Sequence, residues 1–162
     1  MSIEVISNGK KYFIENETVH LVDFSLSKFW NLIVTTSKIR RIIQRFQPDV
    51  IHIHQANSVA FYALLANRKI KTPTILTAWG SDILLNPKKS TILKCLVKFN
   101  LRNADFFTSD AVFMAEEMRR LSPSLKLNIL IANFGIGIDT QQLPKENIIY
   151  SNRLHFPLYR ID

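Results

Sequence analysis

Apolar residues are arranged along the chain in two kinds of pattern, short continuous runs and longer stripes at helical spacing. The short runs are rich in β-branched and aromatic residues, as expected for buried strands, and lie at 3–6, 19–24, 50–54, 74–77, 104–108 and 127–132. The stripes predict helices at about 27–46, 60–66, 92–101 and 110–121. Strand and helix therefore alternate from residue 50 to 131. This alternation predicts an α/β fold with a doubly wound parallel sheet.

Several of these elements have recognisable ends. Pro48 disfavours the helical conformation of the residue before it and therefore ends the first long helix. Ser25 or Ser27 is available to cap the start of that helix, and Ser90 is available to cap the helix that follows it at 92–101. Asp110 is predicted to start the next helix, which the pair Ser122-Pro123 ends.

The composition of the sequence changes after residue 139. Residues 141–146 are mostly polar and read as a linker, and the apolar run at 148–150 reads as the first strand of a new unit. We therefore predict a main domain over 1–143, followed by a linker and the beginning of a second domain over 144–162.

Basic residues are spread along the chain and do not form one block. The formal net charge is +8, from 21 Lys and Arg against 13 Asp and Glu. Scattered charge argues against a nucleic-acid-binding stripe. Two alternatives remain: attraction to an anionic membrane surface, and an ordinary solvated basic surface.

Cys95 is the only cysteine of the chain, so no intrachain disulfide can form. Because it lies in a predicted helix among apolar neighbours, we expect a buried structural cysteine and not a catalytic thiol. The first residues lack the apolar core of a signal peptide, and no run approaches the length needed to span a bilayer. We therefore expect a cytoplasmic protein.

The strongest candidate for chemistry is the stretch Trp79-Gly80-Ser81-Asp82, which follows the predicted strand at 74–77. Ligands of open α/β sheets bind beyond the carboxyl ends of the strands, so these side chains are well placed for a site. The same residues also suit a purely structural role, with Gly80 in a tight turn and Ser81 or Asp82 as a cap.

Histidines give a second, weaker signal. His52 and His54 alternate with apolar residues in one predicted strand, so both point to the same face of the sheet. The pair could contribute to a metal site, although buried histidines satisfied by hydrogen bonds are commoner. The chain contains no glycine-rich dinucleotide or phosphate loop, no serine-hydrolase elbow and no HExxH or CxxC motif.

An ordered series of short motifs resembles a known family. The motifs are PDVIHIH at 48–54, TAWGSD at 77–82, AD at 104–105, TSD at 108–110, GIDT at 137–140 and SNRL at 151–154. In this order they resemble the GT-B glycosyltransferases of the retaining group that includes glycogen synthase-like and lipopolysaccharide- or capsule-assembling enzymes, the glycosyltransferase family 4-like proteins.

The resemblance implies two Rossmann-like domains around a cleft, with the acceptor on the N-terminal side and a nucleotide sugar on the C-terminal side. By that comparison the chain is an N-terminal domain fragment. Residues 3–6 resemble the family's second strand, so the family's first strand and its glycine-containing loop have no counterpart. The carboxylate pair of the second domain also has none.

The chemistry implied is transfer of a glycosyl group, of the hexosyltransferase type, from a nucleotide sugar to a hydroxyl of a glycan or lipid-linked acceptor in cell-surface polysaccharide synthesis. Electrostatics and helix N-termini would stabilise the departing diphosphate, with no metal and no other cofactor. Asp82 is the catalytic candidate, and the acceptor-binding candidates are His54, Trp79, Gly80 and Ser81. The donor-binding candidates are Gly137 and Arg153.

Two positions depart from the family pattern. Trp79 occupies the place of the family's usual histidine, and the lysine expected shortly after Arg153 has no counterpart. The implied setting is cytoplasmic, peripheral at the inner face of the membrane. An alternative function is an inactive remnant or interaction module without catalytic activity, because the chain matches only part of a complete cleft.

Overall fold

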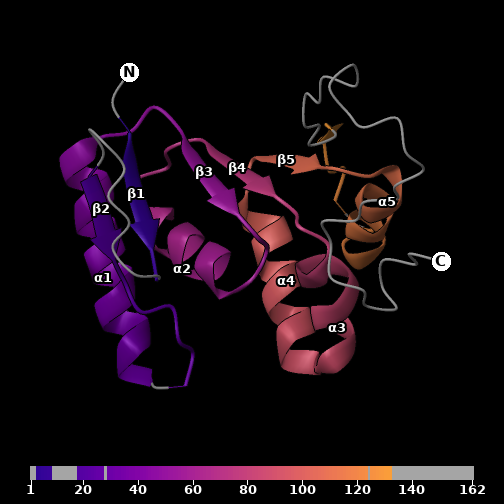
Figure 1. Ribbon diagram of the computed structural model, residues 1–162, viewed down its shortest axis with the longest axis horizontal. Coiled ribbons are helices and arrows are strands. Elements are labelled where there is room, and N and C mark those ends of the chain that lie inside the picture. Colours follow the sequence, from indigo (N-terminus) through magenta and orange to yellow (C-terminus); the bar gives the residue numbers. More distant parts are fainter. Residues whose placement is uncertain (1–2, 9–17, 28, 124, 133–162) are drawn as a thin grey trace, which may run out of the picture.

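The computed structural model describes residues 3–8, 18–27, 29–123 and 125–132 (Figure 1). These form twelve elements along the chain: β1 (Glu4–Ser7), β2 (Thr18–Leu21), α1 (Phe29–Phe46), β3 (Ile51–His54), α2 (Ser58–Asn67), β4 (Thr74–Thr77), the π-helix η1 (Ser81–Leu85), α3 (Asn86–Lys89), α4 (Thr91–Asn103), β5 (Phe106–Ser109), α5 (Val112–Leu121) and β6 (Ile129–Ile131). The alternation of strand and helix predicted from residue 50 onward is confirmed.

The strands pair in two separate sheets. β1 pairs with β2, and β3, β4, β5 and β6 form a second sheet in that order. Each pair of neighbouring strands is parallel, which confirms the predicted parallel α/β, Rossmann-like architecture. The predicted strand at 104–108 begins later, at Phe106, because the Asp105 carboxylate instead accepts hydrogen bonds from the backbone N–H of Thr74 at 2.9 Å and its hydroxyl at 2.7 Å.

One face of the four-stranded sheet carries the main core. Its inward residues Ile53, Leu76, Phe107 and Ile129 are buried together with side chains from α2, α4 and α5. On the opposite face, Phe106 is 53% exposed and Leu130 is 65% exposed. The strand order follows the chain order, so successive right-handed crossovers place their helices on the same side of the sheet. The described helices that pack on this sheet therefore cover one face.

A second core lies between α1, α2 and the segment after β2. Its buried members are Val22, Phe24, Ile39, Ile43, Tyr62 and Ala66. The Tyr62 hydroxyl reaches the backbone carbonyl of Ser25 at 2.8 Å, which ties α2 to the chain before α1. α1 packs along α2, as Figure 1 shows, so the two cores share α2.

Helix ends follow the sequence in part. Ser90 caps α4 as predicted, because its hydroxyl accepts from the backbone N–H of Leu93 at 3.2 Å. The prediction that Asp110 starts a helix is wrong. α5 begins at Val112 with Ala111 at the cap position, and the Ser109 hydroxyl accepts from the N–H of Ala111 instead.

Cys95 contradicts its predicted burial. It is exposed on α4, whose buried side is formed by Leu96, Val97, Asn100 and Leu101. The thiol therefore does not belong to the core. The domain boundary predicted at 143–144 lies outside the described residues. Within the described part of the chain, no helix is both long and apolar enough to cross a membrane.

Candidate functional site

The carboxyl ends of β3 and β4 lie side by side because the two strands are parallel and in register. His54 at the end of β3 is aligned with Thr77 at the end of β4, and the N–H of Gln55 donates to the Thr77 carbonyl at 2.9 Å. The loop 55–57 and the stretch 79–82 therefore leave the sheet at the same edge. This is the edge at which the sequence predicts a site.

Asp82 connects these two loops. Its carboxylate accepts from the backbone N–H of Ala56, in the loop after β3, through Oδ2. Through Oδ1 it accepts from the N–H of Trp79 at 3.0 Å and of Ile83 at 3.1 Å. The residue is only 2% exposed. The Asp82 carboxylate thus links the ends of β3 and β4. Hydrogen bonds to a charged acceptor such as this one are stronger than those between neutral groups.

Two opposing effects act on the Asp82 carboxyl group. Burial raises its pKa above the ordinary value of 3.8, and the backbone N–H groups that it accepts from oppose this rise. The raised pKa means that burial of the charge outweighs the hydrogen bonds. The catalytic role predicted for Asp82 remains a prediction, and these contacts describe an anchor of the backbone.

Gly80 shapes the turn between Trp79 and Asp82. Its φ of +91° lies where side-chain-bearing residues are strained, while a Cβ built there would meet no heavy atom within 4 Å. The glycine is therefore needed for its backbone conformation and not for space. Its carbonyl accepts from the N–H of Ile83 at 3.1 Å and of Leu84 at 2.7 Å, which starts η1. Ser81 follows it and is exposed.

Trp79 and His54 form the accessible part of this edge. Trp79 is 52% exposed, and its ring lies edge-on to the His54 ring with centroids 5.9 Å apart. The rings of His54 and His52 lie 4.2 Å apart, which confirms that the two histidines share a face of the sheet. An exposed indole beside an imidazole can stack on a sugar ring and donate hydrogen bonds to its hydroxyls.

A row of polar side chains continues from these histidines across the sheet. His52 Nε2 lies 2.7 Å from the Thr77 hydroxyl, which lies 2.6 Å from the Thr108 hydroxyl of β5. Burial, and then the neighbouring His54, lower the pKa of His52 below 6.5. Sequence reasoning did not include the two threonines in the site. The repeated Thr in TAW and TSD, at the ends of two predicted strands, was the signal available.

The buried side-chain amide of Asn100 holds the loop after β3 in place. Asn100 of α4 is fully buried and donates from Nδ2 to the backbone carbonyl of Asn57 at 3.0 Å. Asn57 in turn caps α2, because its side chain accepts from the N–H of Val59 at 2.9 Å. Asn100 was also missed by sequence reasoning. Its signal was a single amide on an otherwise apolar helix stripe.

The predicted acceptor-side residues thus come together. His54, Trp79, Gly80, Ser81 and Asp82 all lie at the carboxyl ends of β3 and β4. The predicted donor-side residues, Gly137 and Arg153, lie outside the described residues. Among the residues that the structure describes, no group of three or more His, Cys, Asp or Glu side chains could hold a metal ion.

A parallel α/β sheet with helices packed on it and polar side chains beyond its strand ends defines a Rossmann-like domain. Residues 1–111 match the family described as glycosyl transferase 4-like, which is more than half of the chain. The chain therefore belongs to this glycosyltransferase family, whose members work with a sugar donor and an acceptor. No curated protein matches the chain.

Proposed function

We propose that the chain is the acceptor-side domain of a retaining GT-B glycosyltransferase, which transfers a sugar from a nucleotide sugar to a hydroxyl of a glycan or lipid-linked acceptor in cell-surface polysaccharide synthesis. The observation that carries the proposal is the exposed Trp79 beside His54, at the strand ends of a glycosyltransferase-family domain. Trp79 stacks on a sugar ring of the acceptor, and His54 and Ser81 bind its hydroxyls.

We propose that Asp82 positions the acceptor-binding residues and does not itself contact the acceptor. Both of its oxygens already accept from backbone N–H groups, and the carboxylate is buried. It therefore fixes the backbone on which Trp79 and His54 stand. Gly137 and Arg153 are proposed to bind the donor diphosphate, without a metal ion, as the family resemblance implies.

Acceptor binding can be measured directly, because the chain has only two tryptophans. In a Trp30→Phe background, Trp79 is the only indole, and its fluorescence is titrated with bacterial oligosaccharides. We expect a saturable change in emission, with binding at least about tenfold weaker in His54→Ala, since stacking and hydrogen bonding are both reduced. Unchanged emission with every oligosaccharide would contradict the proposal.

A companion pair of variants tests stacking itself. Trp79→Phe keeps an aromatic face, while Trp79→Ala removes it, and binding is followed by isothermal calorimetry with the same oligosaccharides. We expect Trp79→Ala to lose more affinity than Trp79→Phe. Equal loss in both would assign the interaction to the indole N–H and not to stacking.

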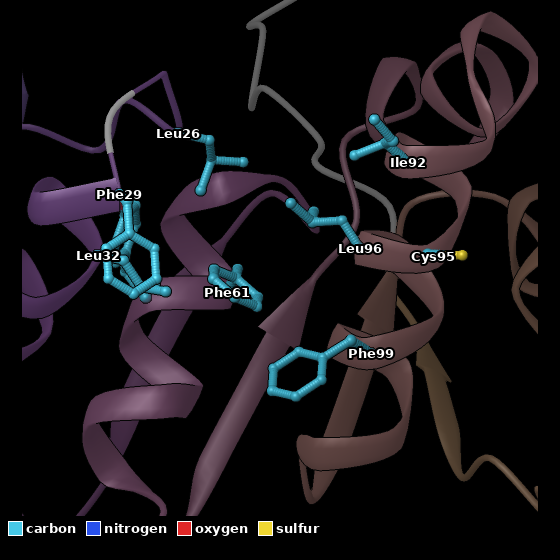
Figure 2. Close-up of a pocket in the computed structure, with 9 residues that line it drawn as sticks. Leu26, Phe29, Leu32, Phe61, Ile92, Cys95, Leu96 and Phe99 are labelled. Atoms are coloured by element: carbon cyan, nitrogen blue, oxygen red, sulfur yellow. The ribbon is translucent and has the colours of Figure 1, made fainter.

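The proposed setting is the cytoplasmic face of an anionic membrane. At the start of α1 and on α4 large apolar side chains are exposed, with Trp30 at 73% and Ile92 at 77%. Between them lies an open apolar groove of about 630 Å³, lined by Leu26, Phe29, Leu32, Phe61, Tyr62, Ile92, Cys95, Leu96 and Phe99 (Figure 2). Lys88, Lys89 and Lys94 lie on α3 and α4 beside Ile92 in sequence.

Exposed aromatic and aliphatic residues with nearby lysines suit the interface of an anionic bilayer. Flotation with vesicles of phosphatidylglycerol and phosphatidylcholine tests this, with pure phosphatidylcholine as the comparison. We expect binding only to the anionic vesicles, and weaker binding by Trp30→Ala and by Lys88→Glu. Equal binding to both vesicle types would contradict the charge contribution.

The alternative, an interaction module without catalysis, is favoured by one observation, the separation of the strands into two sheets. Sugar transfer from radiolabelled nucleotide sugars to membrane acceptors by the purified chain distinguishes the two. Transfer would support the enzyme. Absence of both transfer and saturable acceptor binding would support the module, because an acceptor-side domain retains acceptor binding.

A further inference from the structure

Three non-glycine residues among those that the structure describes have a left-handed backbone. Their φ angles are 50° at Gln47, 76° at Gln55 and 65° at Lys71. Gln47 and Lys71 each follow a helix, and the N–H group of each donates at 2.8 Å to the carbonyl four residues earlier. A left-handed residue is common at such a helix end. Gln55 is different, because it follows the strand β3 at the edge that carries the candidate site.

The backbone of Gln55 turns the chain away from β3. Its N–H donates to the Thr77 carbonyl at 2.9 Å, and the N–H of the next residue, Ala56, donates to the Asp82 carboxylate. The left-handed conformation lies between these two hydrogen bonds. Glycine adopts this conformation without strain. The backbone alone therefore does not account for a glutamine at position 55.

The side-chain amide of Gln55 is oriented by a short chain of hydrogen bonds. The backbone N–H of Val59 can only donate, so the Asn57 atom that caps it at 2.9 Å is the oxygen Oδ1. Asn57 therefore presents Nδ2 to Gln55, whose Oε1 accepts at 2.6 Å. The Nε2 group of Gln55 keeps two N–H donors for which no described residue is the acceptor. Since Gln55 is partly exposed, these donors are available to a ligand.

The loop that carries this amide is fixed from two sides. From the core, Asn100 donates to the Asn57 carbonyl at 3.0 Å. From β4, the buried Asp82 accepts from the N–H of Ala56. The Nε2 donors are thus held in place before a ligand binds. Groups that are already ordered lose little conformational entropy on binding, so a hydrogen bond from them contributes more to affinity.

The loop of Gln55 and the stretch of Trp79 meet at one carboxylate. Asp82 accepts from the N–H of Ala56 through Oδ2 and from the N–H of Trp79 through Oδ1. The backbones at 56 and 79 are therefore neighbours beyond the strand ends. A sugar ring that stacks on the exposed indole of Trp79 lies at the edge that also carries the Gln55 amide.

We propose that Gln55 is a specificity-determining residue of the acceptor site and donates from Nε2 to one oxygen of the sugar that stacks on Trp79. This role rests on the proposed function, since it requires a sugar acceptor at Trp79. Stacking depends on the apolar face of a sugar, whereas a hydrogen bond depends on the direction of one oxygen. Gln55 therefore selects between sugars that differ in the orientation of a single hydroxyl.

Contact with Gln55 is measured on the full chain by NMR of its ¹⁵N-labelled side-chain amide. The probes are the methyl glycosides of glucose, galactose and mannose, because galactose and mannose each differ from glucose in the orientation of one hydroxyl. We expect the Nε2 signals of Gln55 to shift saturably, with the dissociation constant that Trp79 emission gives in the Trp30→Phe background.

Two outcomes of this titration separate the role of Gln55 from the proposed function. A saturable response of Trp79 without a shift at Gln55 would overturn the role of Gln55 and leave the acceptor site standing. No response at either residue, with these glycosides and with the oligosaccharides, would overturn both.

A matched pair of variants tests the selection itself. Gln55→Met keeps the length of the side chain and removes its amide, and Gln47→Met is the same change at a left-handed residue outside the site. We expect the native chain and Gln47→Met to prefer one glycoside by about threefold or more, and Gln55→Met to lose this preference. Unchanged amide exchange at Val59 would show that the start of α2 remains folded. A preference retained in Gln55→Met would overturn the proposal.

Gln55→Gly distinguishes selection from a structural role. Glycine removes the left-handed strain and also removes the amide. We therefore expect a Tm at or above that of the native chain, together with the same loss of preference between the glycosides. A lower Tm with the preference intact would make Gln55 a structural residue of the turn and overturn the proposal.

Discussion

The two sheets of this chain are built from strands of similar length but are covered very differently. In the four-stranded sheet, Leu76 of the interior strand β4 is fully buried, and helices α2, α4 and α5 pack on one face. In the two-stranded sheet, no residue of β1 or β2 is buried. Isolated two-stranded sheets are marginally stable in water. Stability should therefore be concentrated in the four-stranded sheet, which also carries the candidate site.

The two-stranded sheet is held to α1 by polar contacts in addition to the packing of Ile6 against the second core. Glu4 lies 2.8 Å from His20 of β2 and 3.2 Å from Arg45 of α1. The Arg45 side chain is largely exposed, and such ion pairs contribute little. By contrast, the ends of β3 and β4 are held by the buried Asp82. The candidate site therefore stands on the better-anchored part of the molecule.

The two sheets should differ most in how much stability is lost when one apolar strand side chain in each is replaced by alanine. We expect Leu76→Ala to lower the free energy of unfolding by about 2–5 kcal/mol, because it leaves a cavity in the main core. Ile6→Ala, in the partly buried β1, should cost less than half as much. Urea unfolding followed by circular dichroism measures both, and equal losses would show that β1 contributes as much to stability as β4.

The anchoring role of Asp82 predicts the next largest effect. Asp82→Ala leaves the N–H groups of Ala56 and Trp79 without their acceptor, so we expect a loss of about 1–3 kcal/mol. Asp82→Asn keeps one carbonyl acceptor and should lose less. Asp49→Ala, a change of the same kind outside this site, serves as the control. A loss no larger than the control's would contradict the anchor.

The raised pKa of Asp82 predicts how this effect changes with pH. A carboxyl whose folded pKa lies above its unfolded pKa binds protons more tightly in the folded state, so folding gains stability as pH falls through the folded pKa toward 3.8. The stability of the native chain relative to Asp82→Asn should therefore improve between neutral pH and about pH 4. A relative loss over that range, in paired urea titrations, would mean that the backbone hydrogen bonds dominate.

A smaller effect is expected at Gly80. Gly80→Ala places a side chain on a backbone with φ of +91°, where open space removes any clash but not the backbone strain. We expect a cost of about 1–2 kcal/mol in thermal unfolding. Ser81→Ala, next in the chain and exposed, should cost less than about 0.5 kcal/mol. If both changes cost the same, the turn does not require glycine.

The smallest effect is expected in the two-stranded sheet. Glu4→Gln weakens its interactions with His20 and Arg45, and we expect a loss below about 1 kcal/mol. Because Arg45 is exposed to solvent, the loss should shrink in 1 M NaCl, where the screening length is about 3 Å. A larger loss that persists in high salt would show that β1 is anchored as firmly as β4.

Local pattern was sufficient for most of the elements. The β-branched runs at 50–54 and 74–77 contain strands, and the stripe predicted at about 27–46 is a helix over Phe29–Phe46 that ends before Pro48. These features follow from side-chain period and from proline geometry, which act over a few residues. The same period placed His52 and His54 on one face. The grouping of His54 with Trp79 followed from the parallel order of the strands.

Other features depended on partners far apart in the sequence. Cys95 was expected to be buried because its neighbours are apolar, yet the orientation of α4 exposes it. Asp82 became a buried anchor only because the loop after β3 brings Ala56 to it from 26 residues away. Asn100 reaches Asn57 in the same manner, across 43 residues.

The strand and helix order, the parallel α/β class and the stretch 79–82 at a strand end could be predicted from the sequence, because each depends on local periodicity and turn chemistry. The division into two sheets, the exposure of Phe106 and Leu130 among the described residues and the burial of Asp82 became apparent only in the three-dimensional structure. These features depend on contacts between backbone and side-chain groups that are distant in the sequence. A linear pattern of apolar and polar residues does not specify such contacts, and burial and hydrogen bonding depend on them.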